Sequence, residues 1–192
     1  MKFTKIPDTT FKEMVMNAGI LLTSFDPTSA EVDAKNIIGA TSGGVTFNAT
    51  PTFTDLGDDI DNCPKNMAEL KRLDSWEAKM SGTFATINNT LAKSLAAAAD
   101  VSGNKITPRN DIATTDFTDI WWVGDYSDKN GDANGGFVAI HLDNALSTGG
   151  LQISATDKSK GKFSFEYTAH YSIDSPDTVP YEIYIKEGTA EA

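Results

Sequence analysis

The feature that most constrains this chain is a repeated two-residue alternation of apolar and polar side chains. The longest example covers residues 162–173, KFSFEYTAHYSI, where aromatic or other apolar residues fill almost every second position. Residues 43–53 and 75–87 alternate in a similar way. Successive side chains of a strand point to opposite faces, so this period predicts sheets with one buried and one polar face. We therefore expect a mainly β protein, a β-sandwich or a partly closed barrel.

Further strands are predicted at 13–23, 117–126, 135–146, 151–158 and 180–188, and one segment has a different period. In NNTLAKSLAAAAD, residues 88–100, apolar side chains recur at helical spacing and alanine is frequent. Asn88 or Asn89 can cap its start, so one flanking helix is predicted at about residues 89–100. Pro51 cannot donate a ladder hydrogen bond, which predicts that its strand lies at an edge or contains a bulge.

The chain of 192 residues is long enough for one sizeable domain, and no repeat or linker divides it. Residues 1–12 are mostly polar and predict an N-terminal arm. Residues 54–74 are the least regular stretch and predict a long loop, which is unusual between two strands and often functional. Residues 187–192 predict a short C-terminal tail. We expect a single domain with these three extensions.

The charge and the single cysteine exclude several classes of protein. The formal net charge of −11 argues against nucleic-acid binding through the general surface, because phosphate contacts need lysine and arginine. The same charge suits a surface that DNA passes without adhering, or simply a soluble protein. Cys63 is the only cysteine, so the chain forms no internal disulfide. Neither a signal-peptide pattern nor a bilayer-spanning apolar run is present, so we expect folding in a reducing cytosol.

No combination of residues predicts catalysis, and we expect neither an enzyme nor a cofactor. Cys63 lies beside Pro64 in an acidic stretch, which disfavours the reactive thiolate. His141 and His170 fall on separate predicted strands, where we interpret them as ordinary strand side chains. One cysteine and two distant histidines give no zinc-site spacing.

One pattern resembles the start of a calcium loop. Asp128, Asn130, Asp132 and Asn134 alternate as oxygen ligands do in such loops, but the twelfth position is Ala139 rather than glutamate. The same residue types are also typical of a hairpin turn. Both interpretations, a plain turn and a weak Ca²⁺ site, stay open.

Several long segments resemble the major tail proteins of long-tailed, non-contractile bacteriophages. They are GGVTFNATPTFTDLGDDIDNCPKN, LKRLDSWEAKMSGTFATI with the alanine-rich segment after it, and PRNDIATTDFTDIWWVGDYSDKNGDANGGFVAIHLDNALSTGG. The resemblance covers roughly residues 13–186 and depends on the succession of segments, not on a catalytic signature. It implies a tail-tube-like β-sandwich with one flanking helix that forms hexameric rings, and the rings stack into the tube through which DNA leaves.

The resemblance also implies the partners and the location. The chain would bind copies of itself, the tape measure protein, the tail tip and the tail terminator, and DNA would pass through without specific binding. It would belong to the virion tail and assemble in the host cytoplasm.

In such a tube the polar strand faces would line the lumen, and the long loop would bridge neighbouring subunits. The first-choice lumen candidates are Thr46, Asn48, Thr50, Glu77, Lys79, Ser81 and Thr83. A second-choice face carries Glu166, Thr168 and His170. The bridging candidates are Asp55, Asp58, Asp59, Asp61, Lys65, Lys71 and Arg72.

Two alternatives stay open at this point. One is a secreted-type carbohydrate- or Ca²⁺-binding β-sandwich module, in which Trp76, Trp121 and Trp122 would form a stacking platform. The other is the tube protein of a contractile injection system, which would share the architecture.

Overall fold

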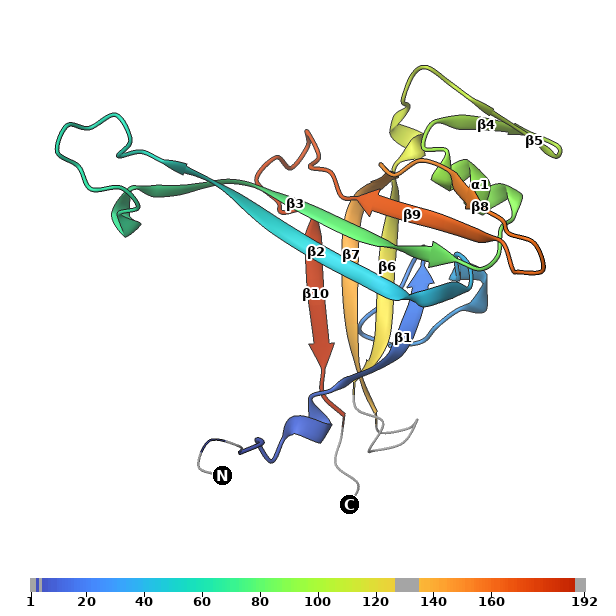
Figure 1. Ribbon diagram of the computed structural model, residues 1–192, viewed down its shortest axis with the longest axis horizontal. Coiled ribbons are helices and arrows are strands. Elements are labelled where there is room, and N and C mark those ends of the chain that lie inside the picture. The colour runs from blue at the N-terminus through green and yellow to red at the C-terminus, as the bar shows by residue number, and fades with distance from the viewer. Residues whose placement is uncertain (1–2, 4, 127–134, 189–192) are drawn as a thin grey trace.

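The computed structural model describes residue 3, residues 5–126 and residues 135–188 (Figure 1). Strands dominate this part of the chain, accompanied by one short helix, α1 (Asn89–Leu95), and four 3₁₀ turns, of which the third, η3, is Ala68–Leu70. The strands are β1 (Val15–Leu22), β2 (Thr41–Asp55), β3 (Lys71–Phe84), β4 (Ala99–Ser102), β5 (Lys105–Pro108), β6 (Thr118–Tyr126), β7 (Gly136–Ser147), β8 (Gln152–Ser154), β9 (Lys162–Thr168) and β10 (Tyr181–Lys186).

Eight of the strands form one antiparallel sheet. Its hydrogen-bonded order is β1-β6-β7-β9-β3-β2, with β10 attached to β7 and β8 attached to β9. The remaining two, β4 and β5, form a separate hairpin. The predicted mainly β fold is confirmed, and within the described residues the sheet does not close into a barrel.

Strand β7 divides this sheet into two layers. Its first part, residues 137–142, pairs with β10 on one side and with β6 on the other, whereas Leu146 and Ser147 pair with β9. Between these parts Asn144 adopts a left-handed φ of 46°, which asparagine tolerates better than most residues. As a result β2, β3 and β9 cross over β6, β7 and β10 (Figure 1).

The hydrophobic core fills the space between the two layers. Met80 on β3 lies opposite Tyr167 on β9, and both are almost completely buried, while their sequence neighbours point away. Helix α1 adds Leu91 and Leu95 to the same core. Burial of each such side chain stabilises the folded state by about 1.5–3 kcal/mol. The apolar side chains that alternate in the sequence therefore hold the two layers together.

The predicted helix is shorter than expected. It ends at Leu95, Ala97 turns with a left-handed φ of 62°, and Ala99 already begins β4. Pairing of β4 with β5, which the sequence analysis did not predict, overrides the helix propensity of the alanines. No helix in the described residues is long and apolar enough to cross a membrane.

Two other predicted boundaries are also wrong. Strand β9 ends at Thr168 rather than at residue 173, and Ile173 is 94% exposed instead of facing the core. The loop predicted over residues 54–74 begins after Asp55 and ends before Lys71, because β2 and β3 remain paired up to those two residues. Pro51 does lie on an edge strand, next to a bulge after Thr52, as predicted.

Replacing Asn88 with alanine is expected to destabilise the protein by about 1 kcal/mol. The Asn88 side-chain oxygen accepts a hydrogen bond of 2.8 Å from the Leu91 backbone N–H and thereby caps α1. The exposed Thr90, on the first turn, offers a control: Thr90→Ala should change the free energy of unfolding by less than about 0.5 kcal/mol. Urea unfolding of the two variants measures the difference, and equal effects would contradict a capping role for Asn88.

Candidate functional site: a polar sheet face and a projecting hairpin

Six of the seven residues of β2 and β3 that were predicted to line a lumen lie opposite one another, and the seventh, Thr83, lies opposite Ser164 of β9. Thr46 pairs with Ser81, Asn48 with Lys79, and Thr50 with Glu77. Directly opposite residues of an antiparallel pair share a face. The intervening Phe47, Ala49, Ala78 and Met80 turn towards the core instead. These candidates therefore form one continuous polar surface.

Two residues of the second-choice face extend this same surface, whereas the third, His170, lies beyond the end of β9 and packs against Phe117. Glu166 on β9 lies opposite Ser81, and Thr168 lies opposite Lys79. Thr168 itself is buried and shares a 2.7 Å hydrogen bond with Thr148. The sequence analysis treated the two faces as alternatives because sequence alone does not show that β3 pairs with β9. We call this joint surface of β2, β3 and β9 the polar face.

The charge of Lys79 on the polar face is balanced by nearby carboxylates. The Lys79 ammonium lies 2.8 Å from the Glu77 carboxylate. The hydrogen bond to Glu77 raises the pKa of Lys79, and the nearby charge of Glu166 adds to this effect. The Lys79 ammonium thus lies near two carboxylates. Their negative charges reduce its attraction for a phosphate group.

The far ends of β2 and β3 form a hairpin that projects from the body of the molecule (Figure 1). Phe53 and Leu73 lie opposite each other on it and are 54% and 47% exposed. Beyond them, the loop of residues 56–70 exposes Leu56, Ile60 and Met67. We call residues 53–73 the projecting hairpin. Its large apolar side chains are exposed although the two strands stay paired up to Asp55 and Lys71.

The loop of the projecting hairpin is held in shape from its base. One carboxylate oxygen of Asp55 accepts a 3.0 Å hydrogen bond from the Gly57 N–H, and the other accepts a 2.9 Å bond from the Asn66 N–H. The Leu56 N–H donates to the Leu70 carbonyl at 2.9 Å. The loop thus presents its exposed side chains from an internally bonded backbone.

The predicted bridging residues do not form separate acidic and basic patches. Lys71 Nζ lies 3.8 Å from Asp55 Oδ2, and Arg72 Nε lies 2.9 Å from Asp74 Oδ1. These two cations are thus already paired within their own chain. The exposed bridging candidates that remain are Asp58, Asp59, Asp61 and Lys65. These three carboxylates and one lysine of the loop thus stay exposed beside its apolar residues.

Acid is expected to loosen this loop. The backbone N–H groups of Asn66 and Gly57, and then Lys71, hold the pKa of Asp55 below its ordinary value of 3.8. A lowered pKa in the folded state means that ionised Asp55 stabilises the loop at higher pH and that this stabilisation disappears as the pH falls through the lowered value. Carbon-detected NMR titration of the carboxyl should give a midpoint below 3.8, which Lys71→Ala raises. A wild-type midpoint at or above 3.8 would contradict these bonds.

Two further groups of residues were singled out from the sequence, the calcium-loop candidates and the three tryptophans. Asp128, Asn130, Asp132 and Asn134 lie outside the described residues. Trp121 is buried, while Trp76 and Trp122 are half-buried in packing contacts. Trp76 packs edge-on against Tyr181, and the Trp122 indole N–H donates to the Ala18 carbonyl. The three tryptophans therefore do not form the exposed stacking platform that the sequence analysis considered.

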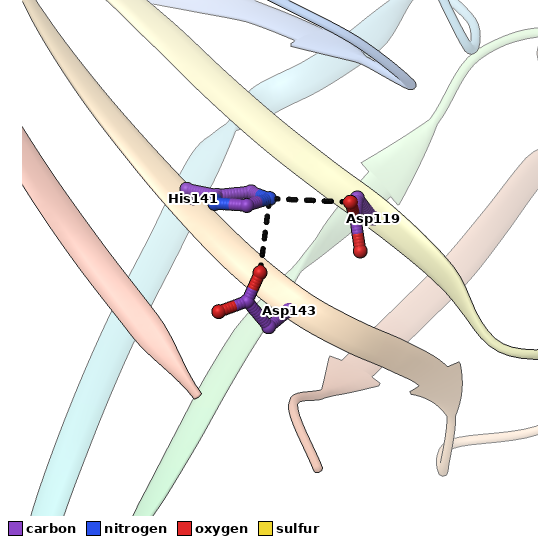
Figure 2. Close-up of side chains that lie close together, drawn as sticks. All are labelled: Asp119, His141 and Asp143. Carbon is purple, nitrogen blue, oxygen red and sulfur yellow. Dashed lines mark ion pairs between the residues drawn. The ribbon is translucent and has the colours of Figure 1, made fainter. Parts of the chain in front are cut away.

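The structure also brings together three residues that the sequence analysis left apart, Asp119, His141 and Asp143 (Figure 2). Asp119 comes from β6, and the other two occupy alternate positions of β7. Their potential ligand atoms all lie within 4.8 Å of one another. The alternation His141-x-Asp143 is visible in the sequence, but the contribution of Asp119 depends on how β6 pairs with β7.

No protein-family model matches this chain, and no curated protein matches it. Among solved structures, a chain from the virion of a native gene transfer agent particle is 8% identical with a TM-score of 0.38. A chain from the tail of an empty gene transfer agent particle, computed with C6 symmetry, is 9% identical with a TM-score of 0.38. Each match covers 81% of this chain and 92% of the other.

Proposed function

We propose that this chain is a structural virion protein that self-assembles into stacked hexameric rings, the tail tube through which a long-tailed phage ejects DNA. The ring, its six-fold order and the tape measure, tail tip and terminator partners come from the sequence resemblance. The observation that carries the proposal is the projecting hairpin, which exposes large apolar residues away from the body of its own subunit.

The projecting hairpin is suited to bind a neighbouring copy. A two-stranded hairpin is marginally stable in water unless its apolar face is covered. Contiguous exposed apolar side chains mark interaction surfaces. Phe53, Leu56, Ile60, Met67 and Leu73 are all between 38% and 54% exposed. In a ring, these residues would be buried against the adjacent subunit or the adjacent ring.

Unpaired strand edges support self-association. Among the described strands, β2 pairs only with β3, and β10 pairs only with β7. On β10, Ile183 and Ile185 are 51% and 62% exposed. Exposed edges promote uncontrolled pairing unless another chain covers them. Closing such edges between identical subunits would extend the sheet around a central channel.

The polar face has the properties that a DNA conduit needs. It is hydrophilic over three neighbouring strands, and the Lys79 ammonium on it is balanced by Glu77 and Glu166. The net charge of −11 repels phosphate. A lumen lined by this face would be wet and would not retain DNA.

Negative-stain microscopy of the purified protein over a concentration series tests the proposal. We expect rings or hollow tubes with six-fold symmetry whose abundance rises with concentration. Sedimentation velocity on the same samples should show a transition from monomer to large species. A protein that remains monomeric at the highest soluble concentration, including after addition of a tail-tip fraction, would refute the assignment.

A further inference from the structure

The cluster of Asp119, His141 and Asp143 lies on one face of the sheet, away from the main core. Asp119 and Trp121 occupy alternate positions of β6, His141 and Asp143 alternate positions of β7, and Trp121 pairs with His141. The Trp121 and His141 rings stack with centroids 4.0 Å apart. This stacking fixes the plane of the imidazole, so that Nε2 points towards the two aspartates (Figure 2).

The separations in this cluster suit a shared cation better than direct hydrogen bonds. His141 Nε2 lies 3.4 Å from Asp143 Oδ1 and 3.6 Å from Asp119 Oδ2. This nitrogen is buried and has no hydrogen-bond partner in the described part of the chain. Two ligands bonded at about 2.1 Å to a tetrahedral zinc ion lie about 3.4 Å apart. The two separations measured from His141 Nε2 therefore match the edges of a zinc coordination shell, and all three ligand atoms lie within 4.8 Å of one another.

Neighbouring groups orient the potential ligands as they do around bound metals. Glu182 Oε2, on β10, lies 3.8 Å from His141 Nδ1, which is on the opposite side of the ring from the aspartates. A carboxylate there favours the tautomer with the proton on Nδ1, which leaves the Nε2 lone pair free for a metal. Tyr184 donates a hydrogen bond to Glu182, and Asp119 accepts one of 3.2 Å from the Asn144 N–H.

The charge around the cluster is unbalanced without a cation. Three carboxylates, of Asp119, Asp143 and Glu182, surround one imidazole, and no lysine or arginine forms an ion pair with them in the described residues. A divalent cation would neutralise this local charge.

We propose that Asp119, His141 and Asp143 bind a zinc ion, with water completing its coordination. An imidazole nitrogen is a preferred ligand of zinc, whereas calcium and magnesium take oxygen ligands. The ion would link β6 to β7, and through Glu182 it would steady β10, the edge strand. The site uses none of the residues of the projecting hairpin or the polar face, so the proposal does not depend on tube assembly.

Isothermal titration of chelator-treated, full-length protein with ZnCl₂ at neutral pH tests the site. We expect saturable binding of one Zn²⁺ per chain, no saturable binding of Ca²⁺ or Mg²⁺, and a higher Tm with Zn²⁺. His141→Ala and Asp119→Asn should abolish the saturable binding. Glu182→Gln should weaken it by about 10-fold, since it removes only an orienting group.

The second histidine supplies the matched control. His170 is the only other histidine in the chain, and its Nδ1 lies 3.1 Å from the Asn144 carbonyl. His170→Ala should therefore bind Zn²⁺ as the wild type does. Asp119 is 53% exposed at its side chain, so Asp119→Asn remains decisive even if His141→Ala does not fold. No binding by the wild type, or wild-type binding by Asp119→Asn, would overturn the proposal.

Discussion

Replacing Ile60 with aspartate is expected to abolish tube formation while leaving the subunit folded. Ile60 is 54% exposed near the tip of the projecting hairpin, so the new carboxylate would be hydrated in the monomer. In the proposed tube the same position is covered by a neighbouring subunit, and an unpaired buried charge there costs about 3 kcal/mol or more. Such a cost weakens each contact by about 100-fold. The loss recurs at every subunit, which makes it the largest effect on assembly that we predict.

Microscopy and sedimentation of the Ile60→Asp protein measure this effect, and Ile112 supplies the control. Ile112 is 60% exposed but lies in the segment between β5 and β6, away from the projecting hairpin (Figure 1). Ile112→Asp should assemble at nearly the wild-type concentration. Circular dichroism and Tm should be unchanged in both variants. Normal tubes from Ile60→Asp would show that the hairpin tip is not an assembly contact.

Replacing Phe84 with alanine is expected to cost about 3–5 kcal/mol of the free energy of unfolding. Phe84 is completely buried at the end of β3, and its ring centroid lies 4.5 Å from that of Phe165. Gly39 approaches the ring so closely that a β-carbon at that position would lie 3.2 Å from it. The cavity left by the ring is therefore enclosed on several sides and cannot collapse easily. Since domains of this size are stable by about 5–15 kcal/mol, the loss is a large share of the total.

Urea unfolding at concentrations where the protein is monomeric measures the loss, and Phe53→Ala is the matched control. Phe53 carries the same side chain on the same antiparallel pair, but it is 54% exposed on the projecting hairpin. Its replacement should cost less than about 1 kcal/mol in the monomer. If both substitutions cost the same, Phe84 would not be a core residue. Phe53→Ala should instead weaken assembly, because the proposed tube buries Phe53 between subunits.

The elements set by local pattern were predictable, and their ends were not. Alternation along residues 43–53 and 75–87 predicted two strands, and Asn88 was one of two predicted caps of the only α-helix described. The alanines after Leu95 led to a helix prediction that was too long. Pairing of β4 with β5 outweighs their helix propensity, and the sequence of the alanine segment does not reveal that partner strand. Ile173 misled the prediction in the same way: alternation continues to that residue, but the backbone leaves the sheet after Thr168.

The sequence by itself determined most of the side chains of β2, β3 and β9 that face the core, since that follows from a period of two along a single segment. In β6 and β7 consecutive residues are buried, so alternation does not assign their faces. Only the tertiary structure decided which strands pair. That pairing joined two predicted polar faces through Ser81 and Glu166, and it carried the β2–β3 pair beyond the body as the projecting hairpin. It also placed Asp119 beside His141, 22 positions along the chain. The physical reason is that strand register is fixed by burial and hydrogen bonding between segments that are distant in the sequence. The sequence of a single segment therefore does not reveal its partner strand or its register.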